Sequence, residues 1–176
     1  MSTQKYTTVA EIAQAIGANY YGLTLLSHLE QYYPELALDF EFIKKKAACA
    51  AEVAAEYVGE HGTDGFSQIE AKNRALDELL GGFGFSKFEV AFRICTDILY
   101  AALGSHELTA SHERQRQLVM CLQPKLEPIF EKYPLDDPEF PASCAYDDFE
   151  DELKKAALRL LQPDIEAARD KVDMPF

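Results

Sequence analysis

The sequence predicts an all-α protein: a single compact domain of about six to eight helices around a central apolar helix at residues 87–103. Capping residues recur along the chain, apolar residues repeat at helical spacing, and no stretch alternates between apolar and polar residues for long enough to predict a strand. The 176 residues are 48% hydrophobic and 27% charged, an ordinary globular balance. We therefore expect one domain over residues 1–176, with a frayed N-terminus at 1–7 and a C-terminal turn or short helix at 163–176.

The helix at residues 87–103 has its own start and stop signals. Ser86, with Glu89 three residues later, forms a capping box, and Gly104 stands where a left-handed residue ends a helix. Between them, apolar side chains cover most of the helix and leave only a narrow polar stripe. Such a helix has to be surrounded by other elements. We therefore expect the core to centre on Phe88, Ala91, Phe92, Cys95, Ile98 and Leu99.

Four helices are expected before the central one, each with a polar N-cap and a residue that ends it. The predicted N-caps are Thr8, Asn19, Asp39 and Ser67, and the predicted ends are Gly17, Tyr33, Glu60 and Leu80. The helix that follows Asp39 carries many alanines on one face. Because alanine lets a neighbouring backbone approach closely, this face suits packing beside the central helix.

The chain after the central helix is richer in proline. A helix is expected from about Ser111, interrupted before Pro124, because the residue that precedes a proline is disfavoured in the helical region. Residues 133–146 contain three prolines and are predicted to form an extended loop. A final helix, capped by Asp147, is expected to run through Leu161.

The formal net charge of −13, from 30 acidic and 17 basic residues, argues against a nucleic-acid-binding protein. Binding through bulk electrostatics requires a basic face that contacts phosphates, so we expect no direct nucleic-acid binding. No run approaches the roughly 18 apolar residues of a membrane span, and no basic-then-apolar N-terminal segment predicts export. We therefore expect a cytoplasmic protein that does not associate with membranes, and the sequence leaves the possibility of a homodimer open.

No catalytic, cofactor or metal motif stands out. His106 and His112 are six residues apart, a spacing that does not place two ligands on one helix face. The segment 81–87 has glycines followed by Ser-Lys before a helix, which is typical of anion binding. It lacks the phosphate-loop spacing and a preceding strand, so we interpret it as a connection between helices. We expect no cofactor and no bound metal.

The polar stripe of the central helix is one candidate recognition site. Glu89, Arg93 and Asp97 are spaced by four residues, which places Arg93 between two carboxylates on one helix face. The simpler interpretation is an ion-pair ladder at the surface of the domain. The more specific hypothesis is a polar recognition strip completed by Tyr100. We rank it below the ladder, because structural ion-pair networks can resemble functional sites.

The acidic segment at residues 136–152 is the second candidate, with eight acidic residues and no Lys or Arg. Acidic residues in the first turn of a helix stabilise its N-terminus, which accounts for part of the segment. The acidic residues in the preceding loop have no such explanation. We expect a basic protein partner to contact this segment, with mimicry of nucleic acid as a lower-ranked variation on that idea. The candidate contact residues are Asp136, Asp137, Glu139, Asp147 and Asp148.

Five stretches also carry a resemblance to a known family: Tyr32–Leu36, Phe42–Ile43, Gly84–Phe88, Ile129–Asp137 and Tyr146–Phe149. Their order and spacing over residues 20–161 resemble the small bacterial family called domain of unknown function 1896, which is commonly met near conjugative mobile elements. The resemblance implies a bacterial cytoplasmic protein, in the accessory cargo of such an element. It implies no activity, catalytic residue or cofactor.

Two functional hypotheses follow. The leading one is a non-enzymatic helical protein that acts by docking a protein partner, because the acidic segment is strong and catalytic patterns are missing. The alternative is a small-molecule-binding domain or enzyme with a site between helices near Phe83–Lys87, Arg93 and Tyr100. A concave apolar pocket with convergent polar groups at that place would favour the alternative.

Overall fold

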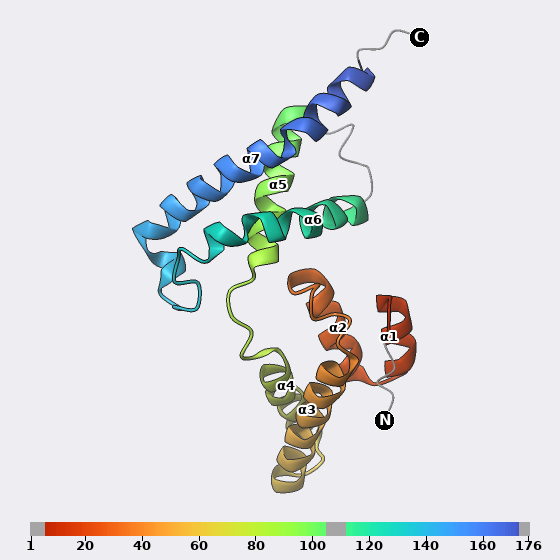
Figure 1. Cartoon of the computed structure of the whole chain (residues 1–176). Coiled ribbons are helices and arrows are strands. Elements are labelled where there is room, and N and C mark those ends of the chain that lie inside the picture. The colour runs from red at the N-terminus through yellow and green to blue at the C-terminus, as the bar shows by residue number, and fades with distance from the viewer. Residues whose placement is uncertain (1–5, 105–111, 173–176) are drawn as a thin grey trace. The chain divides into compact units, whose positions relative to one another are not determined.

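The computed structural model describes residues 6–104 and 112–172, which form α-helices, one short 3₁₀ helix and connecting loops, without a strand (Figure 1). The predicted all-α class is confirmed. The expectations for residues 1–5, for the connection at 105–111 with His106, and for 173–176 lie outside the described residues. The elements are α1 (Val9–Ile16), α2 (Tyr20–Tyr32), α3 (Phe40–His61), α4 (Gly65–Leu80), α5 (Lys87–Leu103), α6 (His112–Phe130), η1 (Phe140–Ala142) and α7 (Cys144–Val172).

The chain divides into two compact units, residues 1–83 and 84–176. Each unit has its own hydrophobic core. The sequence predicted one core around residues 87–103, and that helix, α5, lies at the centre of the second unit alone. The first unit forms a separate core, because α1 to α4 carry enough apolar residues to bury one another's inner faces. Five of these residues are fully buried: Ile12, Leu25, Leu29, Ile43 and Leu79.

In the first unit, α3 and α4 lie side by side as a long helical hairpin, α2 packs against both, and α1 packs against α2 (Figure 1). The contact between α3 and α4 uses small residues, since Ala50, Ala71 and Ala75 are buried. The alanine-rich face of α3 was expected beside the central helix. It packs in its own unit instead, and the small side chains permit the close approach of α4.

The predicted N-caps of α1, α2 and α3 are confirmed: the side chains of Thr8, Asn19 and Asp39 each accept a hydrogen bond from a backbone N–H of the first turn. The prediction for α4 is wrong, because its N-cap is Asp64 instead of Ser67. Asp64 Oδ1 accepts hydrogen bonds from the N–H groups of Phe66 and Ser67, both at 2.9 Å. The helix therefore begins at Gly65.

In the second unit, α5 packs against both α6 and α7. Phe88, Ala91, Cys95 and Leu99 are buried as predicted. Phe92 and Ile98, also predicted in the core, are only partly buried and pack at its margin. The apolar and polar sides of α5 therefore lie as expected, but Phe92 and Ile98 are closer to the surface than predicted.

The helix boundaries after α5 differ from the prediction. α6 continues through Pro124 and Pro128, both of which are exposed, so water can solvate carbonyl groups that lose a helical hydrogen bond. α7 begins at Cys144, three residues before the predicted cap Asp147, and continues through Pro163. Within the described ranges, no helix combines the length and apolar character that crossing a membrane requires.

Candidate functional site

The acidic segment of the second unit is built on a cluster of aromatic rings around Phe149. Phe149 lies on α7 and is fully buried. Its ring centroid lies 5.2 to 5.9 Å from five other aromatic rings, close enough for direct ring contacts. These rings belong to Phe85, Phe130, Tyr133, Phe140 and Tyr146.

The loop between α6 and η1 is held to this cluster. Leu135 and Phe140 are buried, with 9% and 2% of their surface exposed. Asp137 stabilises the turn in two ways: its backbone N–H donates to the carbonyl of Pro134 at 3.0 Å, and its Oδ1 accepts from the N–H of Glu139 at 3.0 Å. The acidic side chains of this loop therefore extend from a backbone with a defined shape.

Two acidic residues of the segment are neutralised by basic side chains. Glu150 accepts a hydrogen bond from the Arg93 guanidinium of α5, and Lys154 Nζ lies 3.5 Å from its other oxygen. Glu152 accepts from Lys132, and the hydroxyl of Tyr133 donates to it at 3.1 Å. The hydrogen bond from Arg93 lowers the pKa of Glu150, and the hydrogen bond from Lys132 lowers the pKa of Glu152. Both carboxylates therefore help to hold α7 in place.

The other six acidic residues of the segment are exposed, and the ion pairs of the described residues include none of them. Five of them are the contact residues predicted from the sequence. We call these five the acidic edge: Asp136, Asp137, Glu139, Asp147 and Asp148. The sixth is Asp151. The aromatic contact between Phe140 and Tyr146, with centroids 5.5 Å apart, joins the loop part of the acidic edge to its part on α7.

The predicted polar strip of α5 is arranged differently from the ladder that its spacing suggested. Arg93 pairs with Glu150 of α7, and neither Glu89 nor Asp97 belongs to an ion pair in the parts of the chain that are described. The side chain of Glu150 is only 18% exposed, so this ion pair is less screened by solvent than a fully exposed one. Tyr100 is 59% exposed. A recognition role for this strip stays a prediction.

The alternative small-molecule site near Phe83–Lys87 gains no support from the local contacts. Lys87 pairs with Glu127 of α6, and Arg93 pairs with Glu150. Phe83 belongs to the first unit, where its ring stacks on Tyr33 at 4.9 Å.

A groove lies elsewhere in the first unit. It is open, has a volume of about 560 Å³, and lies along α2 beside the end of α4. Its lining residues include Tyr20, Leu23, His28 and Leu80.

The buried Cys95 is not placed for thiol chemistry, and the described residues offer no cluster of metal ligands. Burial raises the pKa of Cys95 to about 11, which keeps its thiol protonated and unreactive near neutral pH. In residues 6–104 and 112–172 we find no group of three His, Cys, Asp or Glu side chains placed to share a metal ion.

Sequence reasoning missed the aromatic cluster and the pairing of Arg93 with Glu150. A signal for the cluster was present: Tyr146 and Phe149 are three residues apart, so they share one face of α7. The pair between Arg93 and Glu150 left no local signal, because its members are 57 residues apart in sequence.

Comparison with known proteins supplies the family. No curated protein matches the chain. A crystal structure of protein PG0816 from Porphyromonas gingivalis is similar in fold, with a TM-score of 0.65 and 20% sequence identity, over 89% of this chain and 97% of that chain. The sequence profile of the family described as "Domain of unknown function (DUF1896)" matches residues 14–162. This match spans most of the chain, and the chain therefore belongs to the domain of unknown function 1896 family.

Proposed function

We propose that this chain is a non-enzymatic interaction protein that docks a partner protein with a basic surface through the acidic edge. One observation carries the proposal. Five acidic residues, Asp136, Asp137, Glu139, Asp147 and Asp148, are exposed and outside the ion pairs of the described residues, although nearby Glu150 and Glu152 are both paired. These carboxylates keep their full negative charge at the surface, where it is available to a basic partner.

The support beneath the acidic edge favours recognition over a mobile charged tail. The buried rings of Phe140 and Phe149 and the turn at Asp137 fix the backbone from which the acidic side chains extend. A surface that is already ordered loses less conformational entropy when it binds. Clustered charge of one sign also steers an oppositely charged partner and accelerates the encounter.

The chemistry of the partner follows from the sign of the charge. Five carboxylates without paired cations repel phosphate groups, so a nucleic acid is a poor partner and a surface rich in Lys and Arg is a good one. For the cellular setting, we propose an accessory factor of a bacterial mobile element that acts in the cytoplasm. The family resemblance supports this setting.

Affinity capture from the native host tests the proposal. The bait proteins are the wild type, the neutralised variant Asp136→Asn/Asp137→Asn/Glu139→Gln, and the control Glu35→Gln/Glu52→Gln/Glu56→Gln, which removes three exposed charges from the first unit. At low salt we expect a basic protein with the wild type and the control, and much less of it with the neutralised variant. At high salt we expect weak recovery with all three baits. Equal recovery of every partner with all baits at both salt concentrations would refute docking through the acidic edge.

A further inference from the structure

A second, chemically different surface lies on α4 in the first unit. Phe66 and Ile69 are 76% and 63% exposed, the highest values among the exposed large hydrophobic residues of the described chain. They are three residues apart and therefore share one helix face. The buried side of α4, marked by Ala71, Ala75 and Leu79, faces the core of the unit. By helical spacing, Phe66 and Ile69 lie on the opposite, outer side of α4.

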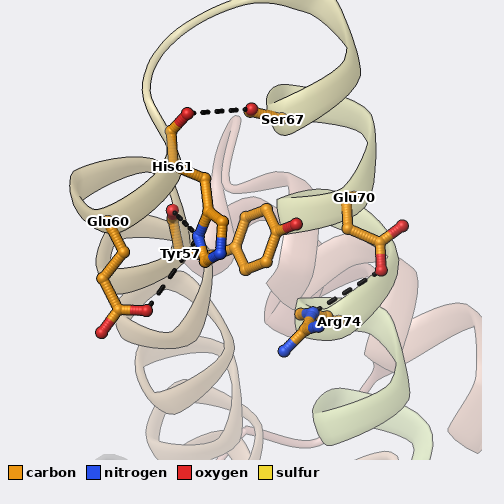
Figure 2. Close-up of polar contacts among 6 residues, drawn as sticks. All are labelled: Tyr57, Glu60, His61, Ser67, Glu70 and Arg74. Atoms are coloured by element: carbon orange, nitrogen blue, oxygen red, sulfur yellow. Dashed lines mark hydrogen bonds and ion pairs between the residues drawn. The ribbon is translucent and has the colours of Figure 1, made fainter.

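Contacts between the end of α3 and the first half of α4 join the two helices of the hairpin, as Figure 2 shows. Ser67 Oγ lies 3.2 Å from the backbone carbonyl oxygen of His61 and 2.9 Å from Asp64 Oδ2, so its single hydroxyl proton has two acceptors within hydrogen-bond distance. His61 stacks on Tyr57 with centroids 4.1 Å apart and planes 12° apart, and the Arg74 guanidinium lies 4.6 Å from the centroid of the Tyr57 ring. These contacts between α3 and α4 fix the helix that carries the two exposed apolar side chains.

Asp77 is an exposed acidic residue beside this face and belongs to none of the ion pairs of the described residues. It follows Phe66 by about three helical turns and therefore lies on the same side of α4. Glu70, one turn after Phe66, is paired with Arg74. Arg74 lies 3.6 Å from Glu70 and covers Tyr57, and Lys72 lies 4.5 Å from the centroid of the Tyr20 ring. Residues 1–83 contain six basic and twelve acidic residues, a net charge of −6.

From this combination we propose that the outer face of α4 docks an amphipathic helix of another protein, with apolar residues against Phe66 and Ile69 and Lys or Arg residues toward Asp77. A helix fits because anchors at helical spacing on one helix are matched by anchors at the same spacing on another. A second copy of this chain fits poorly, because it would bring an equal negative charge and add no free cation on its own α4 face.

The probe is a synthetic helical peptide of about five turns, with Leu at helical spacing and Lys at the remaining positions. Its matched control has the same Leu positions with Glu in place of Lys. Fluorescence anisotropy with labelled peptide and the full chain measures the affinity. The Lys peptide should bind, and the Glu peptide should not. Equal binding of both peptides would overturn the assigned charge of the partner.

Variants locate the binding. Phe66→Ser/Ile69→Ser should weaken binding of the Lys peptide by about tenfold or more, because removing apolar anchors from an interface is costly. Asp77→Asn should weaken it at low salt only. Met120→Ser/Leu158→Ser, which removes exposed apolar side chains of the second unit, is the control and should bind as the wild type does. Asp136→Asn/Asp137→Asn/Glu139→Gln measures the share of Lys-peptide binding that belongs to the acidic edge, and the loss caused by Phe66→Ser/Ile69→Ser should persist in that background. Because Phe66 and Ile69 are exposed, their variant should keep the wild-type melting temperature.

Two further results would overturn the proposal. One is unchanged peptide affinity in Phe66→Ser/Ile69→Ser, which would place the binding elsewhere on the acidic surface. The other is a wild-type dimer in analytical ultracentrifugation that becomes a monomer in the same variant, which would assign the outer face of α4 to a second copy of the chain.

Discussion

Phe149 is the residue on which the support of the acidic edge depends most. It is fully buried, and five aromatic rings have their centroids within 5.9 Å of its own. We expect Phe149→Ala to lower the free energy of unfolding by about 3–5 kcal/mol, because it leaves a cavity among rings that can relax only partly. Urea denaturation measures the change, and a loss below about 1 kcal/mol would show that the site is not packed as described.

Glu150 gives the second unit a predictable response to acid. The hydrogen bond from Arg93 is the main cause that lowers its folded-state pKa below the ordinary value of 4.5. The carboxylate therefore stabilises the fold fully above the unfolded pKa, and this contribution is lost as the pH falls through the lower folded pKa.

We expect the wild type to exceed Glu150→Gln in unfolding free energy by about 0.2–1 kcal/mol at neutral pH, since the pair is partly exposed. The difference should shrink below pH 4.5 and vanish when the carboxyl is protonated in both states. Urea unfolding at several pH values measures it. Glu131→Gln, which removes an exposed carboxylate of the same unit, is the control and should change the unfolding free energy at neutral pH by less than about 0.5 kcal/mol. A constant difference at all pH values would contradict the assigned role of the pair.

The five residues of the acidic edge were identified from composition, and all five are exposed, as a contact surface requires. Their contact with a partner stays a prediction. The partner of Arg93 was not identified, because helical spacing offered Glu89 and Asp97 while the tertiary structure supplied Glu150. Phe66 and Ile69 were overlooked, although their spacing on the side of α4 away from Ala71 and Ala75 would have marked an exposed apolar face.

At the level of elements, the start of α5 is the most direct test of a predicted cap. Ser86 is only 8% exposed, and its hydroxyl oxygen accepts a hydrogen bond from the N–H of Glu89 at 3.0 Å. We expect Ser86→Ala to lower the free energy of unfolding by about 0.5–2 kcal/mol, because it leaves that donor without its partner. Thermal or urea unfolding measures the loss. Ser27→Ala on the exposed side of α2 is the control and should change stability by less than about 0.5 kcal/mol, and equal effects of the two variants would contradict the capping role.

Helix existence was easier to predict than helix boundaries. Thr8, Asn19 and Asp39 cap their helices as expected, because a cap depends on the few residues that follow it. At α4, both Asp64 and Ser67 have side chains suited to an N-cap. Asp64 is the cap, and the Ser67 hydroxyl lies within hydrogen-bond distance of the His61 carbonyl instead. At α6, Pro124 was expected to interrupt a helix that in fact continues, since its exposed position lets water satisfy the freed carbonyl.

For the whole molecule, the sequence predicted the class but not the division into two cores. Apolar periodicity shows which face of a helix is buried and does not show which helix covers it. The alanine-rich face of α3 illustrates this limit, because its small residues would suit any close neighbour and the structure pairs it with α4. The net charge does not distinguish the two units either, since residues 1–83 have a net charge of −6 and residues 84–176 have a net charge of −7. The docking proposal therefore depends on where unpaired acidic residues lie, and the net charge does not decide it.

The central claim is that the acidic edge attracts a basic partner, and the most direct test is the association rate constant measured as ionic strength rises. The partner is the basic protein recovered by affinity capture, and the chains compared are the wild type and Asp136→Asn/Asp137→Asn/Glu139→Gln. We expect the wild type to associate faster at low salt, and the two rate constants to converge as ionic strength passes about 0.15 M, where the screening length falls to about 8 Å. Identical association rate constants for the two chains at every ionic strength would contradict the claim.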